Sequence, residues 1–133
     1  MLKKLLLVLL FFGLIFSPII FLSTPSLLIV QSFLDKNKDK EWAQSWQLSL
    51  ARLYITTFRE EDGIRTYKIF LSRYPNHKNI IQIKFDFCMV LAKAEGRKQE
   101  AISAFNEFIE LYPEHELTPQ AEKKRDQLIY VSF

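Results

Sequence analysis

The sequence repeats itself once with a period of 38 residues. Residues 63–77 read GIRTYKIFLSRYPNH and residues 101–115 read AISAFNEFIELYPEH, and the two segments align without a gap. The positions that match in chemical character are Ile64 with Ile102, Tyr67 with Phe105, Phe70 with Phe108, Leu71 with Ile109, Tyr74 with Tyr112, Pro75 with Pro113 and His77 with His115. An internal repeat of this kind predicts a fold built from stacked copies of one supersecondary unit.

Each copy has the pattern of an amphipathic helix. Its apolar residues recur at i, i+3, i+6, i+7 and i+10, which places them on one face of an α-helix. The Tyr-Pro pair near the end of each copy predicts the end of that helix, because a residue before proline is disfavoured in the helical region. A further helix is predicted before each copy, over residues 41–58 and 79–95, and a closing helix is predicted over residues 119–130.

Turn residues separate these predicted helices. Gly96 suits the left-handed backbone that often follows a helix. Thr118 and Pro119 are typical of an N-cap and a first helical position. The predicted fold is therefore all-α: two antiparallel helix-turn-helix units and a closing helix over residues 41–133, following an N-terminal hydrophobic helix.

The N-terminal part of the chain has a different composition. Residues 5–34 carry no charge, and the 18 residues 5–22 are almost purely apolar. As a helix these 18 residues would be about 27 Å long, close to the roughly 30 Å of a membrane's hydrocarbon core, and residues 27–30 would complete a span. We predict that residues 1–34 are an uncleaved single-pass anchor that meets the membrane over residues 5–30. The alternative is a signal segment cleaved near Ser23, although no typical small-residue site is present.

Residues 35–40 predict a polar, charge-alternating linker between this segment and the helical domain. Lysines flank the apolar segment on both sides, so the positive-inside rule does not decide its orientation. Trp42 and Trp46 follow the linker and fit either core packing, the preferred interpretation, or a position at the membrane interface.

The repeat resembles the tetratricopeptide repeat. Gly96 is similar to the family's turn residue, Ala101 to its small packing residue, Phe105 to its aromatic and Pro113 to its terminal proline. The first copy departs from the pattern, because Gly63 stands where alanine is usual and no glycine marks the turn inside its pair. The period also exceeds the usual length of about 34 residues. In this it resembles extracytoplasmic bacterial repeats, such as those of the Tol–Pal-associated periplasmic protein and the outer-membrane barrel-assembly lipoprotein.

The resemblance implies a scaffold or adaptor that binds a protein partner, as a peptide or a helix, on the concave face of the first helices. The positions on that face are Arg52, Ile55, Asp86, Val90, Lys93 and Lys124. The resemblance also favours a location outside the cytoplasm, in the cell envelope. The alternative is a structural subunit whose apolar segment packs inside a larger membrane complex. Because solenoids usually need three or more repeats, we expect stabilisation by a partner or by self-association.

Other classes of function find no support in the sequence. Lys3 and Lys4 account for two of the 18 basic residues, so the rest of the chain nearly balances its 15 acidic residues and lacks the basic face of a nucleic-acid binder. Cys88 is the only cysteine and is predicted to be buried, which excludes an intrachain disulfide or a cysteine zinc site. His77 and His115 are repeat equivalents, so no metal site is predicted. Neither a phosphate-binding glycine loop nor a nucleophile elbow occurs. We therefore predict no catalytic residues, no enzymatic activity and no cofactor.

Overall fold

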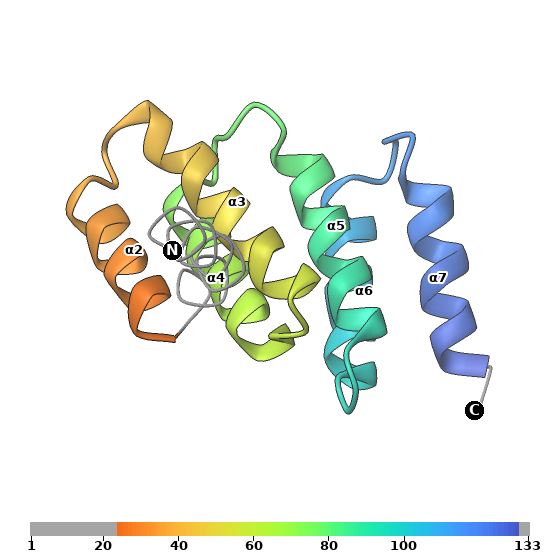
Figure 1. Cartoon of the computed structure of the whole chain (residues 1–133). Coiled ribbons are helices and arrows are strands. Elements are labelled where there is room, and N and C mark those ends of the chain that lie inside the picture. The colour runs from red at the N-terminus through yellow and green to blue at the C-terminus, as the bar shows by residue number, and fades with distance from the viewer. Residues whose placement is uncertain (1–23, 131–133) are drawn as a thin grey trace, which may run out of the picture. The chain divides into compact units, whose positions relative to one another are not determined.

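A computed structural model describes residues 24–130 of the 133-residue chain. Within this range every regular element is a helix (Figure 1). The helices are α2 (Thr24–Lys36), α3 (Glu41–Thr56), α4 (Glu60–Arg73), α5 (Ile80–Lys93), α6 (Lys98–Leu111) and α7 (Thr118–Tyr130). The all-α prediction is confirmed for these residues, with helix boundaries within a few residues of those expected for α3 to α7. The predicted apolar helix of residues 5–22 lies outside the described residues.

The chain divides into two compact units, residues 1–43 and 44–133. In the first unit, α2 ends where the Asn37 N–H donates to the Leu34 carbonyl at 3.1 Å and the Asn37 side chain donates to the Phe33 carbonyl at 2.9 Å. The segment predicted as a linker, residues 35–40, consists here of the end of α2 and a tight turn into α3. None of the helices in residues 24–130 is both long enough and apolar enough to cross a bilayer.

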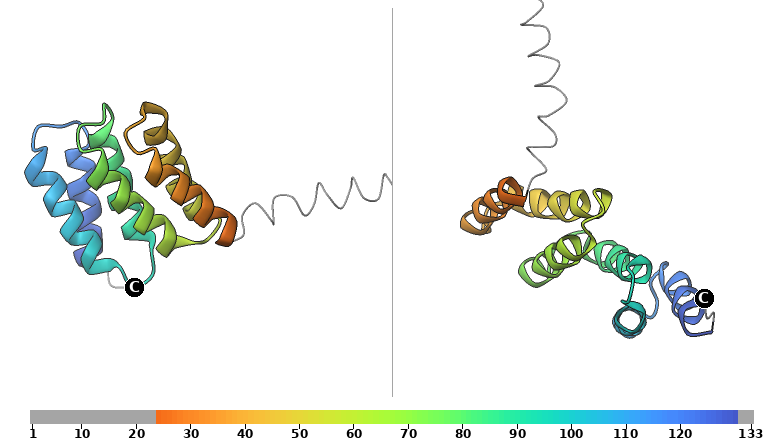
Figure 2. Two further views of the ribbon diagram at one scale, coloured as in Figure 1. Left: turned by 90° about the vertical axis from the view of Figure 1, so that its left-hand side faces the viewer. Right: turned by 60° about the horizontal axis from the view of Figure 1, so that its bottom comes forward.

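In the second unit, successive helices run antiparallel and lie in two rows. The right-hand view of Figure 2 shows α3, α5 and α7 in one row and α4 and α6 in the other. The apolar core follows from this arrangement, because each helix of the second row packs against helices of the first. Three clusters of buried residues belong to it. They are Ala51, Tyr67, Phe70, Tyr74 and Ile83; Ile64, Leu91, Ala94 and Ala101; and Phe85, Cys88, Phe105, Phe108 and Ala121. The apolar helix faces predicted from the repeat therefore form the core.

Both copies of the repeat end in the same hydrogen-bonded turn. The His77 N–H donates to the Tyr74 carbonyl at 3.1 Å, and the His115 N–H donates to the Tyr112 carbonyl at 3.1 Å. In each copy the backbone N–H two residues further on donates to the Nδ1 of the histidine ring, at 3.1 and 3.2 Å. The two histidines thus act as turn-forming residues, which is the role that repeat equivalence predicts.

Thr118 differs from its predicted role as an N-cap. It is the first residue of α7, and its hydroxyl donates a hydrogen bond to the Tyr112 carbonyl. That bond ties the start of α7 to the end of α6, so the side chain joins two helices where the sequence indicated a local cap.

The turns inside the two helix pairs share an unusual backbone. Gly96 has a φ of 71°, in a turn closed by the Arg97 N–H and the Ala94 carbonyl at 3.3 Å. The left-handed backbone predicted for Gly96 is thus confirmed. Phe58, one period earlier, has a φ of 59° and is 94% exposed. The first pair therefore makes the turn without the expected glycine, and an aromatic residue takes a backbone conformation that costs roughly 1–2 kcal/mol outside glycine.

A second departure from the family pattern also has a structural reason. A Cβ at Gly63 would lie 2.7 Å from the Cγ1 of Ile55 and closer still to its Cδ1. The side chain of Ile55 thus fills the space that a methyl group at position 63 would need. In the second pair that methyl group belongs to the fully buried Ala101, and Lys93 stands at the position that corresponds to Ile55.

Replacing Phe58 by glycine is expected to stabilise the protein by about 1 kcal/mol, because glycine adopts a positive φ without steric cost. The exposed ring loses little buried surface in the exchange. Gly96→Ala is expected to destabilise the protein by about the same amount, since the space around Gly96 is open and only the backbone is strained. Urea unfolding of the full-length chain in mild detergent measures both changes.

Phe58→Ala is the matched control, because it removes the ring and retains the Cβ that causes the strain. Equal unfolding free energies for the alanine and glycine variants would show that the backbone at position 58 stores no strain.

Candidate functional site

A groove of about 360 Å³ lies where α4, α5 and α6 meet. Each helix contributes residues spaced three or four positions apart, which is the spacing that places side chains on one helix face. The lining residues are Lys68, Leu71 and Ser72 from α4, Lys84, Phe87 and Cys88 from α5, and Ala104, Glu107, Phe108 and Leu111 from α6. The groove is thus mainly apolar, with a few charged and polar groups, which is the usual composition of a binding pocket.

The floor and the rim of the groove differ in exposure. Cys88 and Phe108 belong to the buried cluster between α5, α6 and α7, and they form part of the floor. Leu111 is 52% exposed and stands at the rim. A large apolar side chain at the rim is available to a bound molecule without any rearrangement of the core.

Ion pairs connect the two second-row helices beside the groove. Lys68 of α4 donates to Glu100 of α6 at 2.6 Å, and Arg97 also pairs with Glu100 at 2.6 Å. Arg97 reaches back to Glu61 of α4 as well. Lys68 and, to a lesser extent, Arg97 hold the pKa of Glu100 below its ordinary value of 4.5. This network fixes Lys68 at one side of the groove, and Lys84 lies 5.5 Å from the ring centroid of Tyr112.

The surroundings of Cys88 disfavour reaction of its thiol. Burial raises the pKa of its thiol to about 12, and the nearby Glu107 carboxylate acts in the same direction. Because the thiolate is the nucleophilic form of cysteine, the thiol has a packing role in the floor of the groove. This agrees with its predicted burial.

The six residues predicted for the concave face fall into three pairs with different surroundings. Arg52 of α3 and Asp86 of α5 lie 3.7 Å apart as an ion pair, and Gln82 donates to the Asp86 carboxylate at 2.8 Å. Beside them, burial raises the pKa of the Tyr67 hydroxyl, and a hydrogen bond from Arg52 opposes that effect. Arg52 and Asp86 thus couple the first helices of the two pairs.

Ile55 and Val90 are partly buried against the core clusters, so the structure gives both a packing role. Lys93 is exposed near the end of α5, and Lys124 is half-buried on α7. Of the six predicted positions, the structure therefore brings Arg52 and Asp86 into direct contact and places the two lysines further along the same row of helices.

The groove and the predicted face lie on opposite sides of α5. At about 100° per residue, Asp86 and Lys93 project roughly opposite to Lys84 and Cys88. Sequence reasoning missed the groove because its aromatic residues have the spacing of core residues. One signal was present: Leu111 is apolar at a position where the first copy has Arg73.

Trp42 and Trp46 are 41% and 61% exposed, so the preferred prediction that both pack in the core is wrong. Among residues 24–130, His, Cys, Asp and Glu side chains nowhere gather in a group of three that could hold a metal ion. The absence of enzymatic activity and of a cofactor stays a prediction.

One family model matches part of the chain. The family model described as tetratricopeptide repeat matches residues 89–115, which run from the middle of α5 through α6 to the turn at His115. A comparison with curated proteins found no match. The resemblance to a tetratricopeptide repeat is therefore confirmed for the second copy, and four residues of the groove, Ala104, Glu107, Phe108 and Leu111, lie inside the matched repeat.

The Cys88 thiol is expected to resist alkylation in the folded protein. With a pKa of about 12, its thiolate fraction at pH 8 is about three orders of magnitude below that of an ordinary cysteine with a pKa of about 8.5. Mass spectrometry after treatment with iodoacetamide should show an unmodified native chain and complete modification in guanidinium chloride.

A Ser72→Cys, Cys88→Ser variant is the control, because Ser72 is an exposed residue of the same groove. Its new thiol should react at the rate of a free cysteine. Rapid alkylation of native Cys88 would contradict both its burial and its raised pKa.

Proposed function

We propose that the chain is a membrane-tethered adaptor that binds a protein partner in the groove between α4, α5 and α6. The observation that carries the proposal is the tetratricopeptide repeat at residues 89–115, which supplies the α6 wall of this groove. Repeats of this family generally mediate protein–protein interaction, and the described residues offer a hollow suited to that role.

The chemistry of the groove describes the part of the partner that binds. A volume of about 360 Å³ lies at the lower end of the range for ligand pockets. It suits one or two apolar side chains of a peptide or helix. Lys68 is already paired with Glu100, and Lys84 lines the groove together with the carboxylate of Glu107, so an apolar anchor without a strong charge of its own fits best.

The tether is the apolar segment of residues 5–22, which lies outside the described residues. Residues 27–30, which the sequence predicted to complete the span, belong to α2 in the structure. Its length and lack of charge support a single membrane span. The resemblance to extracytoplasmic bacterial repeats favours a repeat domain outside the cytoplasm, in a bacterial cell-envelope complex. Cleavage of this segment and release of the domain is the alternative for its location. The second candidate function is a structural subunit whose apolar segment packs against other spans.

Site-specific photo-crosslinking in intact membranes tests the adaptor role. A benzoylphenylalanine at Leu111, on the rim of the groove, is expected to capture one discrete protein. Benzoylphenylalanine in place of Lys93 tests the surface that the family resemblance implies. In place of the exposed Glu122 of α7 it serves as a control.

The partner captured at Leu111 should bind a Leu111→Asp variant at least about tenfold more weakly, which corresponds to roughly 1.4 kcal/mol. Capture at Lys93 alone would move the site to the concave face. If replacement of residues 5–22 by an unrelated membrane span abolishes all capture, the structural-subunit function is supported and the adaptor function is wrong.

A further inference from the structure

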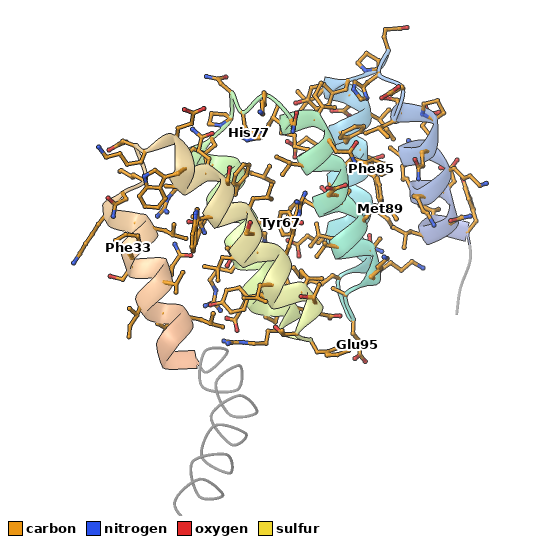
Figure 3. The ribbon with its side chains drawn as sticks, turned by 45° about the horizontal axis from the view of Figure 1, so that its top comes forward. Phe33, Tyr67, His77, Phe85, Met89 and Glu95 are labelled. Atoms are coloured by element: carbon orange, nitrogen blue, oxygen red, sulfur yellow. The ribbon has the colours of Figure 1, made fainter. Side chains whose placement is uncertain are left out.

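Helix α2 and the start of α3 expose several large apolar side chains. Leu28, Ile29 and Phe33 are 60%, 70% and 56% exposed, and Trp42 is 41% exposed. Phe33 lies on α2 (Figure 3). Its ring stacks with that of Trp42, with the centroids 5.7 Å apart. Isolated exposed apolar residues are common in proteins, but four within the described residues of one small unit form a patch that calls for a partner.

Helix α2 is already packed on its other side. Leu27 and Leu34 are only 1% exposed, and their spacing of seven residues places them on one face, two turns apart. The exposed patch is therefore a second apolar face, nearly opposite the first. A helix that only covered a protein core would be polar on that second side.

The chain itself indicates what covers this face. The 18 apolar residues that we propose to span the membrane end at Leu22, and α2 begins at Thr24. At a maximum of about 3.6 Å per residue, the first turn of α2 must lie within several ångströms of the end of that span. The N-terminal part of its exposed apolar face is thus held close to the membrane surface.

Three lysines of the same unit, which alternate with Asp35 and Asp39, fit this position. Lys36, Lys38 and Lys40 are exposed where α2 ends and the turn begins. Lysines near the apolar face of a surface helix can bind lipid phosphates, and tryptophan and phenylalanine favour the boundary between headgroups and acyl chains.

From these observations we infer that α2 lies along the membrane surface, with Leu28, Ile29, Phe33 and Trp42 inserted at the boundary between headgroups and acyl chains. The helix then works as a second, interfacial contact beside the span, and it fixes the first turn of α3 at the membrane. This inference rests on the proposed membrane tether.

The two tryptophans of the chain provide the test. In a Trp46→Phe variant of the full-length protein, Trp42 is the only tryptophan. The variant is reconstituted in phosphatidylcholine and phosphatidylglycerol vesicles with bromine atoms near the headgroup end of the acyl chains. Trp42 is expected to emit at shorter wavelength than in water and to lose at least about half its fluorescence to the bromines, as a residue at the interface should.

A matched control changes only the apolar face. Leu28→Ser and Ile29→Ser, added to the Trp46→Phe variant, should restore most of the quenched fluorescence, while flotation with the vesicles stays unchanged because residues 5–22 are intact. Leu27 and Leu34 are left in place, so the buried side of α2 is preserved.

The outcomes separate this inference from the tether. A protein that does not float with vesicles would overturn the tether and, with it, the inference. A protein that floats while Trp42 stays unquenched would overturn only the interfacial position of α2. If Trp42 is unquenched and its emission shifts with the protein-to-lipid ratio, a second copy of the chain covers the face, and the inference is wrong.

Discussion

The structure depends on close packing between each second helix of a pair and the first helices on either side of it. In the first pair α4 approaches α3 so closely at Gly63 that the side chain of Ile55 fills the space of a Cβ. In the second pair Ala101 is fully buried with Ile64 and Leu91, so α4, α5 and α6 share one cluster. The groove follows from this packing. The helices α4, α5 and α6, which share this cluster, leave a hollow on their outer side, where Ala104 is small and Leu111 points outward.

Much of the helical architecture was predictable from the sequence, because periodicity and helix-ending residues are local signals. The 38-residue offset predicted that Tyr67 and Phe105 occupy equivalent core positions, and they are 3% and 0% exposed. The equivalent histidines close equivalent turns, as expected. Thr118 was predicted to be an N-cap from a local rule. In the structure, its hydrogen bond to the carbonyl of Tyr112, at the end of the preceding helix, determines its role.

The candidate site was less predictable, because it depends on how three helices meet. Phe87, Cys88 and Phe108 have the spacing of core residues, and spacing alone does not tell the floor of a groove from a closed core. Ile55 was assigned to the concave face by analogy with the family, yet the glycine at position 63 turns it into a packing residue. Phe58 shows the same limit, since a left-handed aromatic in place of glycine follows from the geometry of the turn and not from local preference.

The close approach of α3 and α4 is tested most directly by a double-mutant cycle between Gly63→Ala and Ile55→Ala, with unfolding free energies measured by urea denaturation. Helix propensity alone favours alanine over glycine by about 1 kcal/mol. In the native background the methyl group would meet Ile55, at an overpacking cost of about 1–3 kcal/mol. After the gain in helix propensity, Gly63→Ala is therefore expected to destabilise the protein by up to about 2 kcal/mol. In the Ile55→Ala background the same change should be neutral or stabilising. An effect of Gly63→Ala that is the same in both backgrounds would contradict the packing on which the fold and the groove depend.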